Sequence, residues 1–128
     1  MQKIIVTGGL GFIGSNLIEL LIHNKFRVIN IDKVAYSSNF YNTKEYLKNP
    51  NYKFIKCDLN NKNKLGKIIF KHKPNGIFNL AAETHVDRSI DTPESFINSN
   101  IIGVFNLLEV FKKYSKSNKK AKLIHIST

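Results

Sequence analysis

The chain has 128 residues, of which 42% are hydrophobic, a size and composition that fit one domain with an apolar core. It holds no run of about eighteen apolar residues and no basic-then-apolar leader with a small-residue cleavage site, so we expect a soluble, cytoplasmic protein without a membrane partner. The formal net charge is +11, but the lysines that supply it lack interleaved aromatic residues, which favours a solvated basic surface over a nucleic-acid partner.

A strand, a glycine-rich turn and a helix open the chain. The apolar run 3–6 predicts the strand, and the periodic apolar segment 12–22 predicts the helix. The turn between them is rich in glycine, as in loops that bind a pyrophosphate at the start of a helix. This context predicts dinucleotide binding, and the alternative is a tight structural turn.

Each part of the turn has an expected role. Gly8 and Gly11 would take backbone angles closed to residues with a Cβ and let the main chain approach the pyrophosphate. Gly14 would let the helix and the strand pack closely. The unpaired N–H groups near Phe12 and Ile13 would face the anion together with the positive end of the helix dipole.

An acidic residue ends the second predicted strand, residues 28–31. Asp32 lies eighteen residues after Gly14, where a carboxylate can accept both adenosine ribose hydroxyls and would repel a 2′-phosphate. The sequence therefore favours NAD over NADP as cofactor, although Lys33 weakens this exclusion because a lysine there could meet the extra phosphate. The alternative role of Asp32 is local capping.

The third unit is a short helix over 43–48 followed by a strand over 52–56. Cys57 is the only cysteine, so an internal disulfide is excluded, and it lacks the neighbours of a metal site; we expect a buried thiol and no metal. Asp58 and Leu59 follow the strand, where they would hold the adenine edge. Asp58 could instead cap the helix that begins near residues 60–62.

A helix over 64–71 is predicted to face inward with Leu65, Ile68 and Ile69, and it stops at Pro74-Asn75-Gly76. The buried strand 77–80 follows. The dipeptide Ala81-Ala82 comes next, and such small residues allow a cofactor ring to lie against the backbone, although they also simply pack.

The longest predicted helix covers 93–117, with Thr92 as N-cap and Pro93 at its first position. One apolar stripe is predicted on it, comprising Ile97, Ile101, Val104, Leu108 and Phe111. Phe96, Phe105 and Leu107 widen the stripe, which suggests a second packing partner such as another subunit. Gly103 inside the helix suggests that another part of the chain approaches it closely.

A fifth strand over 123–128 ends the chain. Strands alternating with helices predict an α/β fold, a doubly wound parallel sheet of order 3-2-1-4-5 with right-handed crossovers. Because the last strand lacks a covering helix, we expect residues 1–128 to be an incomplete dinucleotide-binding Rossmann domain, truncated after the fifth strand and without a substrate domain.

These motifs resemble the extended short-chain dehydrogenase/reductases along the whole chain. The resemblance includes Asn100-x-x-Gly103 and His125-Ile126-Ser127-Thr128. The segment after the fourth strand is similar to that of the dTDP-glucose 4,6-dehydratase family, Ala81-Ala82-Glu83-Thr84-His85-Val86-Asp87-Arg88-Ser89. The resemblance implies the N-terminal part of a lyase of deoxysugar synthesis, in which tightly held NAD oxidises the sugar at C4 and water is lost across C5 and C6.

The resemblance also implies the site residues. The implied cofactor-binding residues are Gly8, Gly11, Phe12, Ile13, Gly14, Asp32, Lys33, Val34, Ala35, Asp58, Leu59, Leu80, Ala81, Ala82, Glu83, Thr84 and Ser99. Thr84 and Thr128 would contact the nucleotide-sugar substrate, dTDP-glucose, and Thr128 would hydrogen-bond the sugar near C4.

The family's remaining catalytic groups, an Asp-Glu pair and a Tyr-x-x-x-Lys after the fifth strand, are absent from this chain, which we therefore expect to be inactive alone. A homodimer through the 93–117 helix is implied for the full-length protein. Two alternatives stay open: another extended short-chain dehydrogenase/reductase acting on UDP-sugars, as a 4,6-dehydratase or epimerase, or a non-catalytic NAD-binding module.

Overall fold

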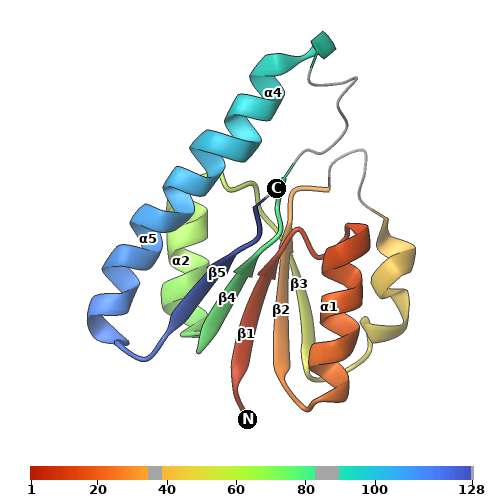
Figure 1. Ribbon diagram of the computed structural model, residues 1–128. Helices are drawn as coiled ribbons and strands as arrows, with labels where there is room; N and C mark the ends of the chain where they lie inside the picture. The colour runs from red at the N-terminus through yellow and green to blue at the C-terminus, as the bar shows by residue number, and fades with distance from the viewer. Residues whose placement is uncertain (35–38, 83–89, 128) are drawn as a thin grey trace.

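A parallel β-sheet forms the middle layer of the chain in a computed structural model, which describes residues 1–34, 39–82 and 90–127. The sheet has five strands in the order β3-β2-β1-β4-β5 (Figure 1). The strands are β1 (Lys3–Thr7), β2 (Arg27–Asp32), β3 (Tyr52–Lys56), β4 (Gly76–Asn79) and β5 (Lys122–His125). The predicted fold class and strand order are therefore confirmed.

Helices cover both faces of this sheet. One face is covered by α1 (Phe12–His23), and the other by α2 (Lys62–His72) and α5 (Gly103–Ser117), as Figure 1 shows. The remaining helical elements are the 3₁₀ helix η1 (Phe40–Tyr46), the short helix α4 (Pro93–Ile97) and a π-helical turn, η2 (Asn98–Ile102). No helix within the described ranges combines the length and the apolarity that crossing a membrane requires.

The strands are apolar on both faces because helices cover both. Ile4 and Val6 of β1 belong to the core under α1, whereas Ile5 belongs to the core under α2 and α5. The predicted inward residues of α2, Leu65, Ile68 and Ile69, are at most 7% exposed. That prediction is confirmed.

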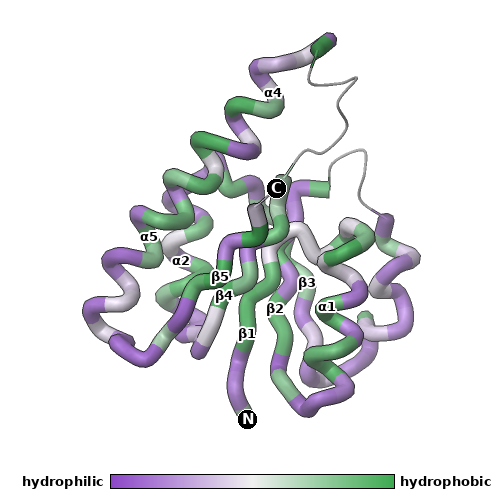
Figure 2. Tube along the Cα trace, in the orientation of Figure 1, coloured by the Kyte–Doolittle hydropathy of each residue, from purple (hydrophilic) through white to green (hydrophobic). Residues whose placement is uncertain are grey.

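The prediction that the apolar stripe forms the buried face of the long helix is wrong. Ile97, Ile101 and Leu108 are 50%, 60% and 49% exposed. The buried residues of α5 are Gly103, Asn106, Leu107, Val110 and Tyr114. Apolar residues recur along α4 and most of α5 (Figure 2), so periodicity alone could not select the face that packs. Polar contacts and a glycine select it instead.

These contacts are specific. The Tyr114 hydroxyl donates to the Pro74 carbonyl at 2.6 Å, and Asn106 Nδ2 donates to the Leu59 carbonyl at 2.9 Å. A Cβ built on Gly103 would lie 3.1 Å from the Leu59 Cβ, so the predicted close approach to this glycine is confirmed.

Two predicted boundaries differ by three residues, and the others by no more than two. The short helix predicted over 43–48 begins at Phe40, because Asn39 Oδ1 accepts a hydrogen bond from the Tyr41 N–H at 2.9 Å and starts the turn earlier. The fifth strand ends at His125 because its partner β4 ends at Asn79, opposite His125. Thr128 lies outside the described residues.

Candidate functional site

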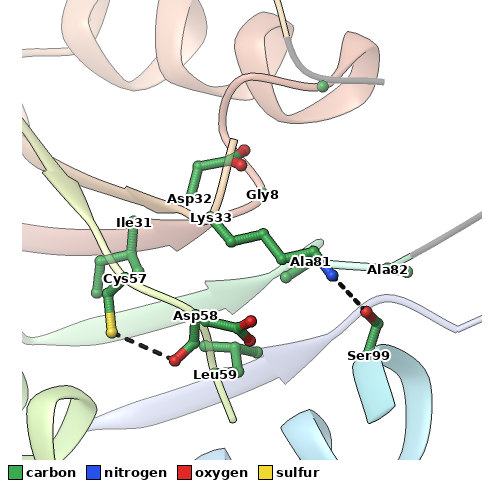
Figure 3. A pocket seen from close by; sticks show the side chains of 11 residues that line it. Gly8, Ile31, Asp32, Lys33, Cys57, Asp58, Leu59, Ala81, Ala82 and Ser99 are labelled. Carbon is green, nitrogen blue, oxygen red and sulfur yellow. Dashed lines mark hydrogen bonds between the residues drawn. The ribbon is translucent and has the colours of Figure 1, made fainter. Parts of the chain in front are cut away.

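A pocket opens where the carboxyl ends of the strands meet the turn before α1 (Figure 3). It is lined by Gly8, Gly11, Ile31, Asp32, Lys33, Cys57, Asp58, Leu59, Ala81, Ala82 and Ser99. In an open parallel sheet this edge is where ligands bind. The pocket joins nine of the residues that sequence analysis proposed for a cofactor.

The glycine-rich turn is packed against its neighbours by backbone contacts. Gly8 has φ +72°, and a Cβ there would lie 2.7 Å from the backbone of Leu80 and Ala81. A Cβ on Gly14 would collide with the Gly8 carbonyl and lie 2.8 Å from the Gly9 Cα. The predicted special angle of Gly8 is confirmed, whereas Gly14 packs on the loop backbone rather than on the strand.

The predicted special angle of Gly11 is wrong. Gly11 is the N-cap of α1 with φ −76° and ψ 174°, an extended conformation open to any residue. Among the residues that the structure describes, a Cβ there would approach the Gly8 carbonyl oxygen, at 3.4 Å, and no other atom within 4 Å apart from its chain neighbours. Sequence reasoning missed Gly9, where a Cβ would collide with the Asn30 carboxamide and lie 2.6 Å from Ile18 Cδ1.

The first turn of α1 offers backbone donors. The Phe12 and Ile13 side chains are 81% and 63% exposed and are not among the pocket-lining residues. The Ser15 N–H donates to the Gly11 carbonyl at 2.9 Å, so the N–H groups of residues 12–14 precede the first i to i−4 hydrogen bond. Together with the helix dipole they form the type of terminus that binds anions.

Asp32 ties the end of β2 to this turn. Its carboxylate is 7% exposed; Oδ2 accepts from the Leu10 N–H at 3.1 Å and Oδ1 from the Val34 N–H at 2.7 Å. Each carboxylate oxygen can accept a further hydrogen bond. Local capping, the alternative for Asp32, is therefore compatible with a second role toward a ligand.

Lys33 crosses the pocket. Its Nζ donates to Ser99 Oγ at 2.6 Å, and Figure 3 shows its side chain extended toward Ala81 and Ser99. Ser99 comes from η2, so this hydrogen bond joins the end of β2 to the π-helical turn. In this arrangement the ammonium group is held by a hydroxyl on the opposite wall.

Asp58 and Leu59 form the wall of the pocket after β3, and Asp58 is held by a residue that does not line the pocket. Asp58 Oδ1 accepts from the Asn60 N–H at 2.9 Å, but Asn61 is the N-cap of α2 and accepts from the Lys64 N–H, so the alternative that Asp58 caps α2 is wrong. Cys57 is 4% exposed, as predicted, and burial raises the pKa of its thiol.

The fourth-strand side of the pocket is built from small residues. Ala81 and Ala82 line it, whereas the Leu80 side chain packs against the core under α1. Val34 lines an adjoining groove with Lys56 and Lys64. Among the proposed site residues, Ala35, Glu83, Thr84 and Thr128 lie outside the described residues. In the part of the chain that is described, no three His, Cys, Asp or Glu residues cluster in a way that could hold a metal ion.

Polar residues at the ends of three apolar strands form a row that sequence reasoning did not identify. Thr7, Asn79 and His125 lie opposite one another in the register of β1, β4 and β5. The signal was present, because each of these polar residues ends its strand at the same sheet edge.

Comparison with known proteins identifies the family. The family model for GDP-mannose 4,6 dehydratase matches residues 5–128. The chain belongs to this family. The chain is similar to a dTDP-glucose 4,6-dehydratase of Haemophilus influenzae. The two sequences are 45% identical over 134 residues, which cover 100% of this chain and 40% of the relative.

Solved structures resemble this member of the GDP-mannose 4,6 dehydratase family over most of its length. The dTDP-glucose 4,6-dehydratase of Bacillus anthracis in complex with NAD has a TM-score of 0.85 at 35% identity and covers 100% of this chain and 38% of its own. The structure of UDP-glucose 4-epimerase of Thermotoga maritima with UDP-glucose has a TM-score of 0.79 at 35% identity. The match covers 88% of this chain and 35% of the epimerase chain. The chain spans about two fifths of the length of the curated relatives it matches.

Proposed function

We propose that this chain is the NAD-binding part of a dTDP-glucose 4,6-dehydratase, an enzyme that converts dTDP-glucose to dTDP-4-keto-6-deoxyglucose. One observation carries the proposal: a single pocket brings together Asp32, the glycine-rich turn before α1 and the small residues Ala81 and Ala82. The Haemophilus influenzae and Bacillus anthracis proteins support it, since both are dTDP-glucose 4,6-dehydratases and the structure of the second holds NAD.

The residues of the pocket fit a dinucleotide. A Cβ on Gly11 would stand in otherwise open space before the α1 N-terminus, where a pyrophosphate would bind the backbone N–H groups. Asp32 would accept the ribose hydroxyls of the adenosine, and the wall of Asp58 and Leu59 would hold the adenine. Ala81 and Ala82 leave room for the nicotinamide half.

The chemistry divides between this chain and the rest of the protein. When bound, NAD would supply the hydride acceptor for C4 of the sugar, and its reduced form would supply the hydride donor for C6. We propose that Thr128 hydrogen-bonds the sugar near C4 and that Thr84 contacts it. The required acids and bases come in the family from groups that this chain lacks, so the chain alone binds part of the cofactor without turnover.

The proposal extends to the assembly and location of the whole protein. Ile101, Phe105 and Leu108 are 60%, 54% and 49% exposed along one side of the long helix. Exposed apolar area of this kind marks an interface. We propose that it is the homodimer interface of a cytoplasmic enzyme.

The test uses the whole protein that carries this chain, incubated with dTDP-glucose and no added reductant. We expect a 4-keto-6-deoxy product by mass spectrometry. Asp32→Ala should weaken NAD binding by about tenfold or more, because it removes two charge-assisted acceptors. Asp91→Ala, which removes the same charge from an exposed residue outside the pocket, is the control. No turnover together with unchanged NAD affinity would refute the proposal.

A second candidate is a UDP-sugar epimerase, favoured by the similarity to the Thermotoga maritima epimerase. A 4-epimer of a UDP-sugar, with no loss of water, would establish it. NAD binding without turnover of either sugar would establish a non-catalytic module.

A further inference from the structure

A row of polar side chains crosses three strands beneath the pocket. Thr7, Asn79 and His125 are register partners at the last positions of β1, β4 and β5. Thr7 and Asn79 are 0% and 1% exposed. Preceding residues of these strands on the same face, such as Ile5, Ile77 and Leu123, pack in the apolar core. Thr7 and Asn79 therefore take the place of apolar core residues at the carboxyl ends of their strands, and the exposed His125 ends the row.

The hydrogen bonds in this row have a consistent direction. The Ala81 N–H donates to Thr7 Oγ1 at 3.3 Å, and the Thr7 hydroxyl donates to Asn79 Oδ1. The Asn79 Nδ2 group is therefore turned toward His125 Nδ1, 3.0 Å away. With the Asn79 amide in this orientation, Nδ2 donates and Nδ1 accepts, so a neutral imidazole carries its proton on Nε2.

We infer that Asn79 is a positioning residue that fixes the tautomer of His125 and holds the ends of β4 and β5 in a fixed position relative to each other. The Asn79 carbonyl also accepts from the Ile126 N–H at 3.1 Å, so backbone and side chain of Asn79 both bind the last strand. Ala81 and Ala82 follow β4 directly, and Thr128 is three residues beyond His125.

The role in turnover rests on the proposed function. If the nicotinamide lies at Ala81 and Ala82 and the sugar near Thr128, Asn79 sets the distance between hydride acceptor and donor without touching either. Misplacement of reacting groups by about 1 Å can cost about 100-fold in rate. Loss of the row should therefore lower kcat while KM and NAD affinity change little.

The experiment measures ¹⁵N shifts of His125 and steady-state kinetics in the whole protein. Unsubstituted protein should show a protonated Nε2 and an unprotonated Nδ1. In Asn79→Asp no N–H remains to donate, so the proton should move to Nδ1, and kcat should fall about tenfold or more. His125→Asn, which keeps an acceptor for Asn79, should retain more activity than His125→Phe.

Asn75→Leu is the matched control, since this exposed residue precedes the opposite end of β4 and its Oδ1 accepts from the Lys3 N–H. It should leave kcat and the His125 shifts unchanged. A proton on Nδ1 in the unsubstituted protein would overturn the inference, as would wild-type kcat in both Asn79→Asp and His125→Phe. If the unsubstituted protein does not turn over dTDP-glucose, the proposed function fails, while the His125 shifts still decide the tautomer.

Discussion

Individual glycines of the turn before α1 serve different physical needs. At Gly8 the fold itself requires that no side chain is present, because φ is +72° and backbone atoms of Leu80 and Ala81 lie where a Cβ would be. Gly11 has an ordinary φ of −76° and open space beside it. The sequence motif marks both positions equally, since it records the residue type and not the reason for it.

Substitution by alanine should separate these needs. Gly8→Ala should lower the free energy of unfolding by at least about 1–3 kcal/mol, because of backbone strain and the collision. Gly11→Ala should leave unfolding nearly unchanged but weaken NAD binding, since its methyl group would occupy the space proposed for the pyrophosphate. Denaturant unfolding and titration calorimetry check both; equal effects of the two variants on stability would contradict this division.

The helices show which elements local patterns predict. The inward residues of α2 follow from spacing alone, because its other face is rich in lysine. The packed face of α5 does not, because apolar residues cover more than the width of one packed face and the choice depends on Gly103, Asn106 and Tyr114 meeting partners distant in sequence. The strand order was likewise predictable from local patterns, whereas the hydrogen bonds that join Thr7, Asn79 and His125 link residues distant in sequence.

Two helix glycines provide a comparison. Gly103→Ala gains about 1 kcal/mol of helix propensity, but the new methyl group would press on Leu59, whose carbonyl is fixed by Asn106. We expect little change in stability and weaker NAD binding, because Leu59 lines the pocket. Gly66 of α2 has room for a methyl group, because a Cβ there would lie 3.9 Å from a Val110 methyl. Gly66→Ala should therefore raise the free energy of unfolding by about 1 kcal/mol and leave NAD affinity unchanged. Thermal unfolding with and without NAD measures both.

At the scale of the whole molecule, the two faces of the long helix differ in exposure. One face packs on α2 and the wall of the pocket, while the other presents Ile101, Phe105 and Leu108 to the surroundings. The width of the apolar stripe predicted a second partner, although it misplaced the face that packs internally. The proposed homodimer assigns the outer face to a second copy.

Charge introduced on the outer face should separate the copies. In the whole protein, Ile101→Asp with Phe105→Asp should convert a dimer to a monomer in sedimentation equilibrium, because buried unpaired carboxylates are costly. The fold should persist, since neither residue belongs to the core clusters. Lys116→Asp, an exposed position on the same helix, should remain dimeric. A dimer that tolerates the double substitution would place the interface elsewhere.

The π-helical turn η2 makes the pocket sensitive to chain length. In η2 the Gly103 N–H donates to the Asn98 carbonyl, five residues back, so the turn contains one residue more than an α-helix would use. Deleting one residue there would close the π-helical turn to an α-helical one and move the side chains of the turn itself, while the flanking helices keep their phase. Ser99 would then leave the wall that Lys33 reaches, with every side chain chemically intact. Among descendants of this gene, single-residue deletions in η2 should thus be eliminated more strictly than most point substitutions in the same helix.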